Sequence, residues 1–431
     1  MIASVQSRIP LRIRRVLKGA CCALLPALLF DCPGTPDVTI FLDWQRVAGD
    51  QGLRAAYGAL IDQYPPLTHV ALALASYMSR AFDLSPFHGL KLILLVAGYA
   101  STIVTQMWRP RLVLPVTAVW SIYGMVYGYL DVLFAAPLLT ALWYLEQERA
   151  GVAGAAFALA CLIKWQPVII APFIFAWFWT RRDWSRLIAF TLAAVVVVAS
   201  VLAVFGLPVI VSFAKAVKDP FISGNALNIP WLVMAALEHL GLWGFGLAGN
   251  GAVANETVSL VNSPFPVLLA VLALKAAFAV AYGWALMRFV GSKAGSFGDL
   301  ILYGLAGFLA FFLLNTGVHE NHLFVPALLA VVLLDHHERP RLVMEGVLAL
   351  SVANLVLFFG PSGKTLFLAG PAALALDMAA VALLVVLYGG LLVSIRKPER
   401  AGEAPDKAVP PSRRGPSAIG KPTSPEQDRS R

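Results

Sequence analysis

The chain has 431 residues, of which 59% are hydrophobic and only 13% are charged, and its formal net charge is +9. Soluble domains are about 45–50% apolar and about 25% charged, so this composition excludes a soluble globular enzyme, a disordered chain and a disulfide-stabilised scaffold. Long apolar runs recur along almost the whole sequence. Such runs predict transmembrane helices, and we therefore expect an all-α, polytopic membrane bundle.

The positive charge is concentrated at the two ends of the chain. Residues 1–18 contain five basic and no acidic side chains, and residues 396–431 contain nine basic and five acidic ones. Basic residues beside membrane spans favour the cytoplasmic side, so both termini are predicted to be cytoplasmic, and nucleic acid is not an expected partner. Because residues 396–431 are rich in Pro, Ser and charge, they are predicted to form a disordered tail.

The membrane domain is predicted to cover residues 19–395. Its first apolar run, near 16–30, is interpreted as an uncleaved span, with a cleaved signal peptide as the alternative. Eleven further runs are expected to span the membrane, which gives about twelve spans, and they lie near 90–108, 112–127, 131–146, 151–164, 166–180, 186–206, 264–289, 299–315, 321–336, 341–359 and 370–395.

The sides of the membrane follow from the basic connections between these runs. All are predicted to be cytoplasmic, and they carry Arg109, Arg111, Arg149, Arg181, Arg182, Arg186, Arg288, Lys293, Arg339 and Arg341. Residues 68–82 and 231–247 are apolar but short or interrupted, so they are predicted to be interfacial helices on the outer face. The first of them belongs to a first outer loop of residues 31–89. If either segment spanned the membrane, the alternation of sides would fail.

Polar sequence islands collect on the predicted outer face. They are DWQR (43–46), DQYPPLTH (62–69), YGYLD (127–131), KWQP (164–167), SGNALN (223–228) and TGVHENH (316–322). Polar residues at the mouth of a membrane bundle are costly and are therefore candidates for function. Because no cytoplasmic loop carries a comparable cluster, the islands indicate a reaction site that faces outward.

Each candidate has a functional and a structural interpretation. The carboxylate of Asp43 can remove a proton from a hydroxyl nucleophile, or it is one solvated acid among others such as Asp37 and Asp62. Lys164 can bind a phosphate as a point charge, or it is a lysine whose stem is buried at the membrane interface. Asp131 stands where it can cap a helix that enters the membrane.

Three further candidates, His319, Glu320 and His322, open the span predicted near 321. They can donate to an anionic group at a helix N-terminus, where backbone N–H groups already favour anions. A zinc site would need ligands from elsewhere, so no cofactor is expected, and a divalent metal is an alternative that the sequence does not indicate. Lys275 and Asp377 lie inside apolar runs and are interpreted as a buried structural pair, with contact to a lipid phosphate as the alternative.

Four of the islands occur in an order that resembles GT-C glycosyltransferases. YPPLT at 64–68, KWQP at 164–167, SGNALN at 223–228 and VHENH at 318–322 are similar to motifs of the glucosyltransferases of lipid-linked oligosaccharide assembly. The resemblance extends to their bacterial relatives and to the GPI mannosyltransferases. It implies transfer of a hexose, mannose or glucose, from a polyprenyl-phosphate sugar to a lipid-linked or glycan acceptor, on the non-cytoplasmic face and with inversion.

The resemblance also implies roles for individual residues. Asp43 in the first outer loop matches the general base, with Asp37 and Asp62 as the fallback candidates for that role. Donor phosphate or sugar is expected to contact Lys164, Gln166, Asn225, His319, Glu320 and His322. Acceptor-side or structural roles are expected for Arg46, Tyr64 and Asp131, of which Asp131 matches the acid of a GQxD-like motif.

The sequence departs from this family pattern at two places. Asn321 occupies the position of the Lys or Arg that usually follows His-Glu, and Gly128-Tyr129-Leu130-Asp131 lacks the glutamine of the GQxD-like motif. Lys164 or His322 is therefore expected to supply the cation for the donor phosphate.

Two other functions remain alternatives. A secondary transporter or lipid-sugar flippase would have a binding site at the membrane midplane, for which Lys275 and Asp377 are the candidates. A catalytically silent relative of the transferases is the second alternative. Membrane lipid is a partner in every case, and a bacterial inner membrane is the expected location, with the endoplasmic reticulum as the alternative.

Overall fold

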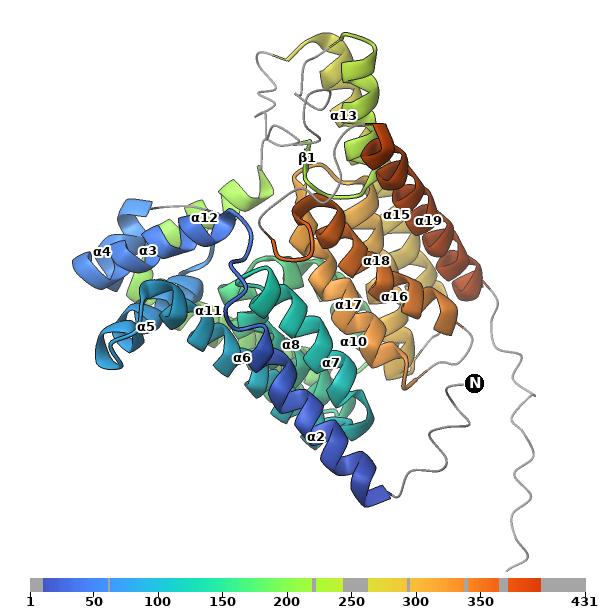
Figure 1. Cartoon of the computed structure of the whole chain (residues 1–431). Coiled ribbons are helices and arrows are strands. Elements are labelled where there is room, and N and C mark those ends of the chain that lie inside the picture. Colours follow the sequence, from blue (N-terminus) through green and yellow to red (C-terminus); the bar gives the residue numbers. More distant parts are fainter. Residues whose placement is uncertain are drawn as a thin grey trace, which may run out of the picture. The chain divides into compact units, whose positions relative to one another are not determined.

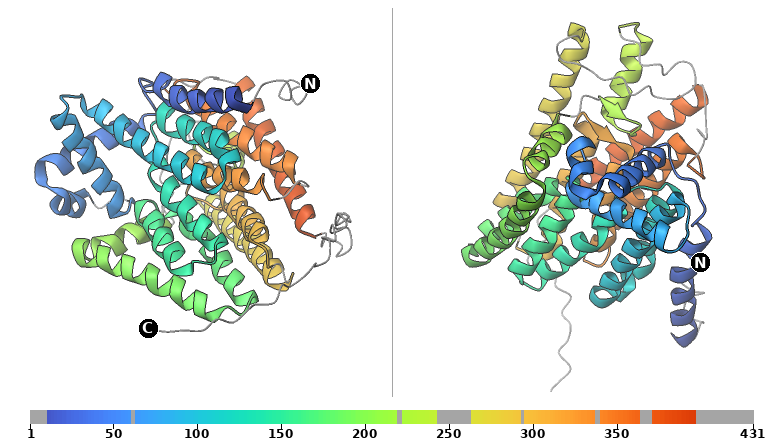
Figure 2. Two further views of the ribbon diagram at one scale, coloured as in Figure 1. Left: turned by 90° about the horizontal axis from the view of Figure 1, so that it is seen from below. Right: turned by 90° about the vertical axis from the view of Figure 1, so that its left-hand side faces the viewer.

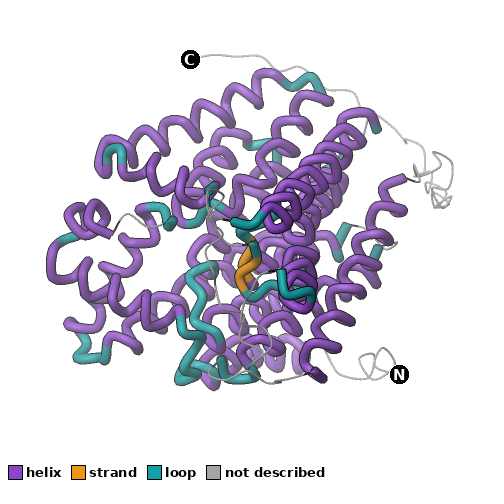
Figure 3. Tube along the Cα trace, turned by 90° about the horizontal axis from the view of Figure 1, so that it is seen from above, coloured by secondary structure: helices purple, strands orange, loops and turns teal. Residues whose placement is uncertain are grey.

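The computed structural model describes residues 11–60, 63–218, 222–242, 263–292, 295–336, 340–363 and 371–396, and these ranges are helical apart from loops and one pair of two-residue strands (Figure 1). The all-α prediction is confirmed. The tail after residue 396, residues 1–10 and Asp62 lie outside the described residues, so nothing is added to the predictions for them. Figure 3 shows the strand pair among the loops at one end of the helices.

Each predicted span corresponds to a helical segment in the described ranges. In chain order these are α2 (Leu11–Leu28), α6 (Pro86–Trp108), α7 (Val113–Trp120) with the π-helix η2 (Ser121–Val126), α8 (Val132–Glu146), α9 (Ala150–Ile163), η3 (Gln166–Ile170) with α10 (Ala171–Thr180), α11 (Trp184–Phe205), α15 (Phe265–Gly291), α16 (Phe297–Leu314), η4 (Glu320–Leu323) with α17 (Phe324–Leu333), α18 (Arg341–Phe359) and α19 (Pro371–Arg396).

Six of these helices are long and apolar enough to cross a membrane, namely α6, α11, α15, α16, α18 and residues Ala375–Ile395 of α19. The others are shorter apolar helices. The count of twelve spans therefore stays a prediction.

Five amphipathic or short helices lie in the connections that were predicted to be on the outer side: α3 (Asp37–Gln51), α4 (Leu53–Leu60), α5 (Pro66–Ala81), α12 (Pro208–Val217) and α13 (Ile229–His239). Figures 1 and 2 show α3, α4 and α5 as a group at one edge of the helical bundle. The apolar stretch 68–82 falls in α5, which begins at Pro66 because proline suits the first helical turn. The described part of 231–247 forms most of α13.

Connections that were predicted to be cytoplasmic meet at one end of the bundle. Arg109, after α6, forms ion pairs with Glu146 at the end of α8 and with Asp335 after α17. These three connections are far apart in the sequence and yet share one network. Their common position is what the predicted alternation of sides requires.

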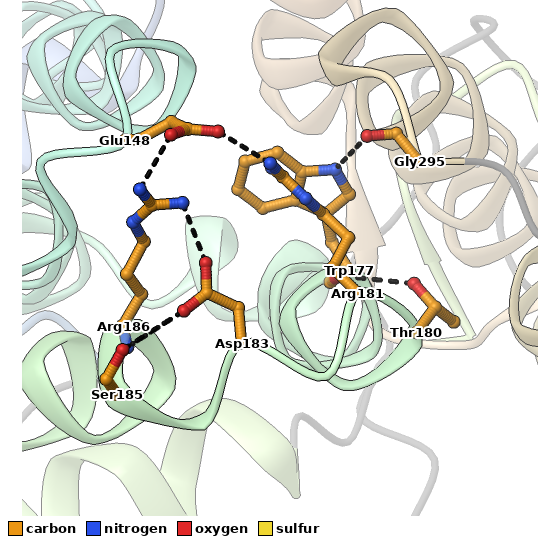
Figure 4. A network of polar contacts seen from close by, with 8 residues as sticks. All are labelled: Glu148, Trp177, Thr180, Arg181, Asp183, Ser185, Arg186 and Gly295. Carbon is orange, nitrogen blue, oxygen red and sulfur yellow. Dashed lines mark hydrogen bonds and ion pairs between the residues drawn. The ribbon is translucent and has the colours of Figure 1, made fainter.

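A second network extends this end of the bundle to two more connections. Arg181 and Arg186 contact Glu148 at 2.6 and 2.7 Å, and the indole of Trp177 donates to the carbonyl of Gly295 at 3.2 Å (Figure 4). The loops that follow α8, α10 and α15 are therefore neighbours.

The connections with the polar islands meet at the opposite end. The N–H of Thr35 donates to the carbonyl of Tyr127 at 3.0 Å, and the Tyr127 hydroxyl donates to the carbonyl of Gly360 at 2.9 Å. Gly128 has a φ of +75°, and a Cβ there would lie 2.4 Å from a methyl group of Val38. The turn before α8 thus needs glycine for both its backbone conformation and its contact with α3.

Close packing between α9 and α11 depends on Gly154. A Cβ at Gly154 would lie 2.1 Å from the carbonyl oxygen of Phe190, and the backbone carbons of Phe190 lie within 2.9 Å. Since a backbone atom cannot rotate away as a flexible side chain can, the two helices would have to separate. One turn earlier in α9, a Cβ at Gly151 would meet Ala189 only at 4.0 Å.

We expect Gly154→Ala to destabilise the protein by about 1–3 kcal/mol, the usual cost of overpacking, despite the better helix propensity of alanine. The measurement is thermal unfolding of the purified protein in detergent. Gly151→Ala is the matched control and should leave the unfolding temperature unchanged or raise it. Equal unfolding temperatures for both variants would contradict the close helix contact.

Candidate functional site

A cavity of about 1140 Å³ lies at the end of the bundle that was predicted to face outward. Its walls come from α3, the junction of α9 and η3, α12, the end of α16 and the segment from β2 into η4. Seven of the residues assigned from the sequence line it: Tyr64, Lys164, Gln166, Asn225, His319, Glu320 and His322. Arg46 and Asp43 are not in this lining, and Asp131 lies buried behind it.

The wall beside α9 is organised by a buried ion pair. Helix α9 ends at Ile163 and the backbone of Lys164 is extended, so the chain leaves the helix axis before η3 begins at Gln166, with Pro167 in its first turn. The Nζ of Lys164 lies 2.6 Å from Oδ2 of Asp131, whose side chain is completely buried. Asn321 also donates to Oδ2 of Asp131, at 3.2 Å. Asp131 occupies the N-cap position of α8 but makes no capping hydrogen bond, so its carboxylate serves Lys164 and Asn321 instead.

Lys164 also contacts the aromatic wall of the cavity. Its Nζ lies 3.4 Å from the hydroxyl of Tyr64 and 5.0 Å from the centre of the Tyr64 ring. The ring of Tyr64 packs edge-on against Trp44 at 5.3 Å and against Phe41 at 6.1 Å. The ammonium group is thus held at the boundary between a polar wall and an aromatic one. That is a suitable place for an anion carried on an apolar molecule.

The opposite wall holds a histidine and a buried glutamate. Oε1 of Glu320 accepts a hydrogen bond from the Tyr129 hydroxyl at 2.5 Å, and the carbonyl of Glu320 accepts one from Asn354 at 3.1 Å. The rings of His319 and His322 are 5.6 Å apart, and the N–H of His319 donates to Nδ1 of His322 at 3.3 Å. These contacts fix the segment by partners from α18 and from the turn before α8.

A two-residue parallel bridge positions His319. Strand β1 (Ser223–Gly224) pairs with β2 (Val318–His319), with Gly224 opposite His319. A Cβ at Gly224 would lie 2.2 Å from Nδ1 of His319, so the imidazole occupies space that only glycine leaves open. Asn225, which follows with a φ of +54°, lines the same cavity. SGNALN and VHENH therefore form one structural unit although they are far apart in the sequence.

Gln166 presents a polar group to this cavity. Its side chain is buried beside Asp131, close enough to interact with that carboxylate, and no hydrogen bond of normal geometry satisfies its amide. A buried amide that is poorly paired costs free energy. The Gln166 amide can therefore also contact a bound molecule in the cavity.

The first outer loop places two of its acids on different sides of α3. Asp43 is exposed, with 74% of its side chain accessible, and it lies 3.7 Å from the exposed guanidinium of Arg46. Asp37, the first residue of α3, lines the cavity. Burial raises the pKa of Asp37, while the charges of His319 and Lys164 lower it. Among the described acids of this loop, Asp37 is thus the one that lines the cavity with the other polar groups.

Several functional neighbours were not assigned from the sequence. Tyr129 and Asn354 hold Glu320, Trp44 supports Tyr64, and Asn228 accepts from Ser223 at 3.0 Å. Trp44, Tyr129 and Asn228 stood within the polar islands and gave a weak signal, whereas Asn354 stands alone in an apolar helix and gave none. No group of three or more His, Cys, Asp or Glu residues suited to a metal occurs among the described residues.

Substituting only one partner of the buried ion pair between Lys164 and Asp131 should destabilise the protein strongly. Removing one partner leaves an uncompensated buried charge, which costs about 3–5 kcal/mol. We expect Lys164→Met and Asp131→Leu each to show this loss, and the double variant to lose much less than their sum. Thermal unfolding of all four proteins in detergent gives the coupling energy.

The exposed pair Asp43 and Arg46 supplies the control cycle, because exposed pairs contribute little. Asp43→Leu and Arg46→Met should show almost no coupling. Additive losses for Lys164→Met and Asp131→Leu would mean that the two side chains do not interact as described.

Among the comparisons with known proteins, one identifies a family. Residues 63–314 match the model of glycosyltransferase family 87, which covers more than half of the chain. The matched part includes Asp131 and Lys164, begins after Asp37 and ends before His319. A search of curated proteins gives no match.

Proposed function

The chain belongs to glycosyltransferase family 87 and is a membrane glycosyltransferase, and from this premise we propose a specific reaction. It transfers a hexose, mannose or glucose, from a polyprenyl-phosphate sugar to a lipid-linked or glycan acceptor on the outer face. The observation that carries the proposal is the convergence of Asp37, Lys164 and His319 on one cavity with an aromatic wall.

Asp37 is the proposed general base. The acceptor hydroxyl has a high pKa and needs a positioned base as it attacks. Asp37 takes its proton while the oxygen forms a bond to the anomeric carbon, and the bond from that carbon to the phosphate oxygen breaks on the opposite side. The products are the inverted glycoside and polyprenyl phosphate. Asp43, the base implied by the family resemblance, stays an alternative, but its exposed position on α3 favours Asp37.

Lys164 and His319 are proposed to stabilise the phosphate as its negative charge develops. Preorganised donors in a site with little water contribute most to such a step, and Asp131 already holds the ammonium of Lys164 in one place. Asn321, which replaces the usual cation after His-Glu, supports Lys164 through Asp131. The apparent loss of a cation is thus compensated by Lys164, which speaks against a catalytically silent relative.

Support for a transporter is weak. Its proposed midplane pair does not form: Lys275 is exposed on α15, Asp377 is buried on α19, and no ion pair joins these two described residues. The polar groups instead surround a cavity at one end of the bundle.

This integral membrane protein is proposed to lie in a bacterial inner membrane, with both termini on the cytoplasmic side.

Asp37→Asn should reduce transfer by about 10²–10⁴-fold, the usual contribution of a general base. The assay uses membranes or purified protein with radiolabelled polyprenyl-phosphate mannose and glucose, each with a panel of lipid and glycan acceptors. Asp43→Asn is the matched control on the same helix and should retain nearly full activity. If Asp43→Asn were inactive and Asp37→Asn active, Asp43 would be the base instead.

The pH dependence of kcat/KM gives a second check on Asp37. The base acts when deprotonated, and burial raises its pKa, so activity should fall as the pH is lowered through a value above the ordinary aspartate range of about 3.9. The charge of His319 lowers this pKa. His319→Asn should therefore move the acidic limb of the remaining activity to higher pH. A limb that stays in place or moves to lower pH would exclude Asp37 as its source.

A further inference from the structure

Lys275 is a cation in an apolar helix that the reaction above does not use. It lies on α15 among Leu, Ala and Phe residues, and its side chain is exposed. A charged side chain on a membrane helix is costly unless it reaches water, a headgroup or a functional partner. The function of Lys275 therefore depends on whether it lies at the membrane midplane or near the headgroups.

The pairing of α15 with α16 gives this depth. The rings of Phe289 and Tyr303 are 4.9 Å apart at the inner end, and those of Phe278 and Phe311 are 5.9 Å apart further out. The two helices are thus antiparallel, and Lys275, one turn beyond Phe278, is level with the end of α16 near Asn315. Lys275 stands at the outer rim of the bundle, rather than at its midplane.

The side of α15 on which Lys275 lies is turned toward η3. Positions 275, 278 and 282 share one helical face. Phe278 lines the cavity, and the hydroxyl of Tyr282 donates to the carbonyl of Ile169 in η3 at 2.6 Å. Lys275 is therefore placed one turn outward of Phe278, level with the end of α16, with its exposed side chain beside the cavity lining rather than in it.

The cavity lining near this face is apolar, and the wall formed by α12 carries two lysines among apolar residues. Val168, Ile169 and Phe278 line the side between η3 and α15, while Lys215 and Lys218 line the side formed by α12. Val217 on α12 is also exposed. Lysines at the rim above apolar side chains suit a molecule with an anionic head and a hydrocarbon chain.

We propose that Lys275 recognises the phosphate of a polyprenyl phosphate that enters the cavity from the membrane between α15 and η3. The hydrocarbon chain lies along Phe278 and Ile169, and the phosphate passes from Lys275 toward Lys164. This assignment rests on the proposed function, because it names the entry position of the same lipid donor. Lys275 is a binding residue and takes no part in the chemical step.

Binding of a polyprenyl monophosphate without sugar tests the proposal in purified protein. We expect Lys275→Met to weaken this binding about tenfold and Lys275→Arg to restore most of it. In the transfer assay, Lys275→Met should raise KM for the donor and leave kcat nearly unchanged. Arg288→Met is the matched control, because Arg288 is an exposed cation at the inner end of the same helix, and it should bind the lipid as the unchanged protein does.

Two results would overturn the proposal. One is equal binding of the monophosphate by Lys275→Met and the unchanged protein. The other is an equal loss for polyprenol without phosphate, or for vesicles of phosphatidylglycerol, because Lys275 would then be a general membrane anchor.

Failure of the proposed function is separate from both results. If no polyprenyl-phosphate sugar supports transfer but the monophosphate binds in a Lys275-dependent way, the reaction is wrong and the binding site stands. If Asp37→Asn abolishes transfer but Lys275→Met binds the monophosphate normally, the entry position alone is wrong.

Discussion

The outer end of this protein depends on the pairing of one buried cation with one buried anion. Asp131 and Lys164 are buried in a largely apolar bundle, where removing either partner leaves the other charge uncompensated. Their contact joins the start of α8 to the end of α9, and Asn321 adds the start of η4 to the same point. Three connections are thereby fixed relative to one another, and the cavity lies against them.

Long-range polar contacts, rather than apolar packing, determine the geometry of the candidate site. Apolar helices pack in many similar ways, whereas a hydrogen bond such as Tyr129 to Glu320 requires one register and one rotation. Gly224 adds a steric condition, because the ring of His319 occupies the space of its missing side chain. Segments that are distant in the sequence therefore meet in one arrangement. This arrangement holds the proposed phosphate-binding side chains in fixed positions.

Most of the fold was predictable from the sequence, because long apolar runs and basic connections each carry a direct physical meaning. The polar islands also located most of the cavity lining. The choice between Asp37 and Asp43 was not predictable: the two positions lie on different faces of α3, and only the packed structure shows which face meets the cavity. Asn354 was missed for a related reason. Its hydrogen-bond partner Glu320 belongs to another element, and this contact is visible only in the packed structure.

The position of Asp131 and Lys164 in one helical hairpin also bears on how the protein is made. If the N-terminus is cytoplasmic, as proposed, both side chains cross the hydrocarbon layer during insertion, and each alone would resist that passage. They lie 33 positions apart at the two outer ends of α8 and α9. A hairpin that inserts as a unit can carry them across as a neutral pair. The ion pair that shapes the cavity would then also lower the free-energy barrier to membrane insertion of this hairpin.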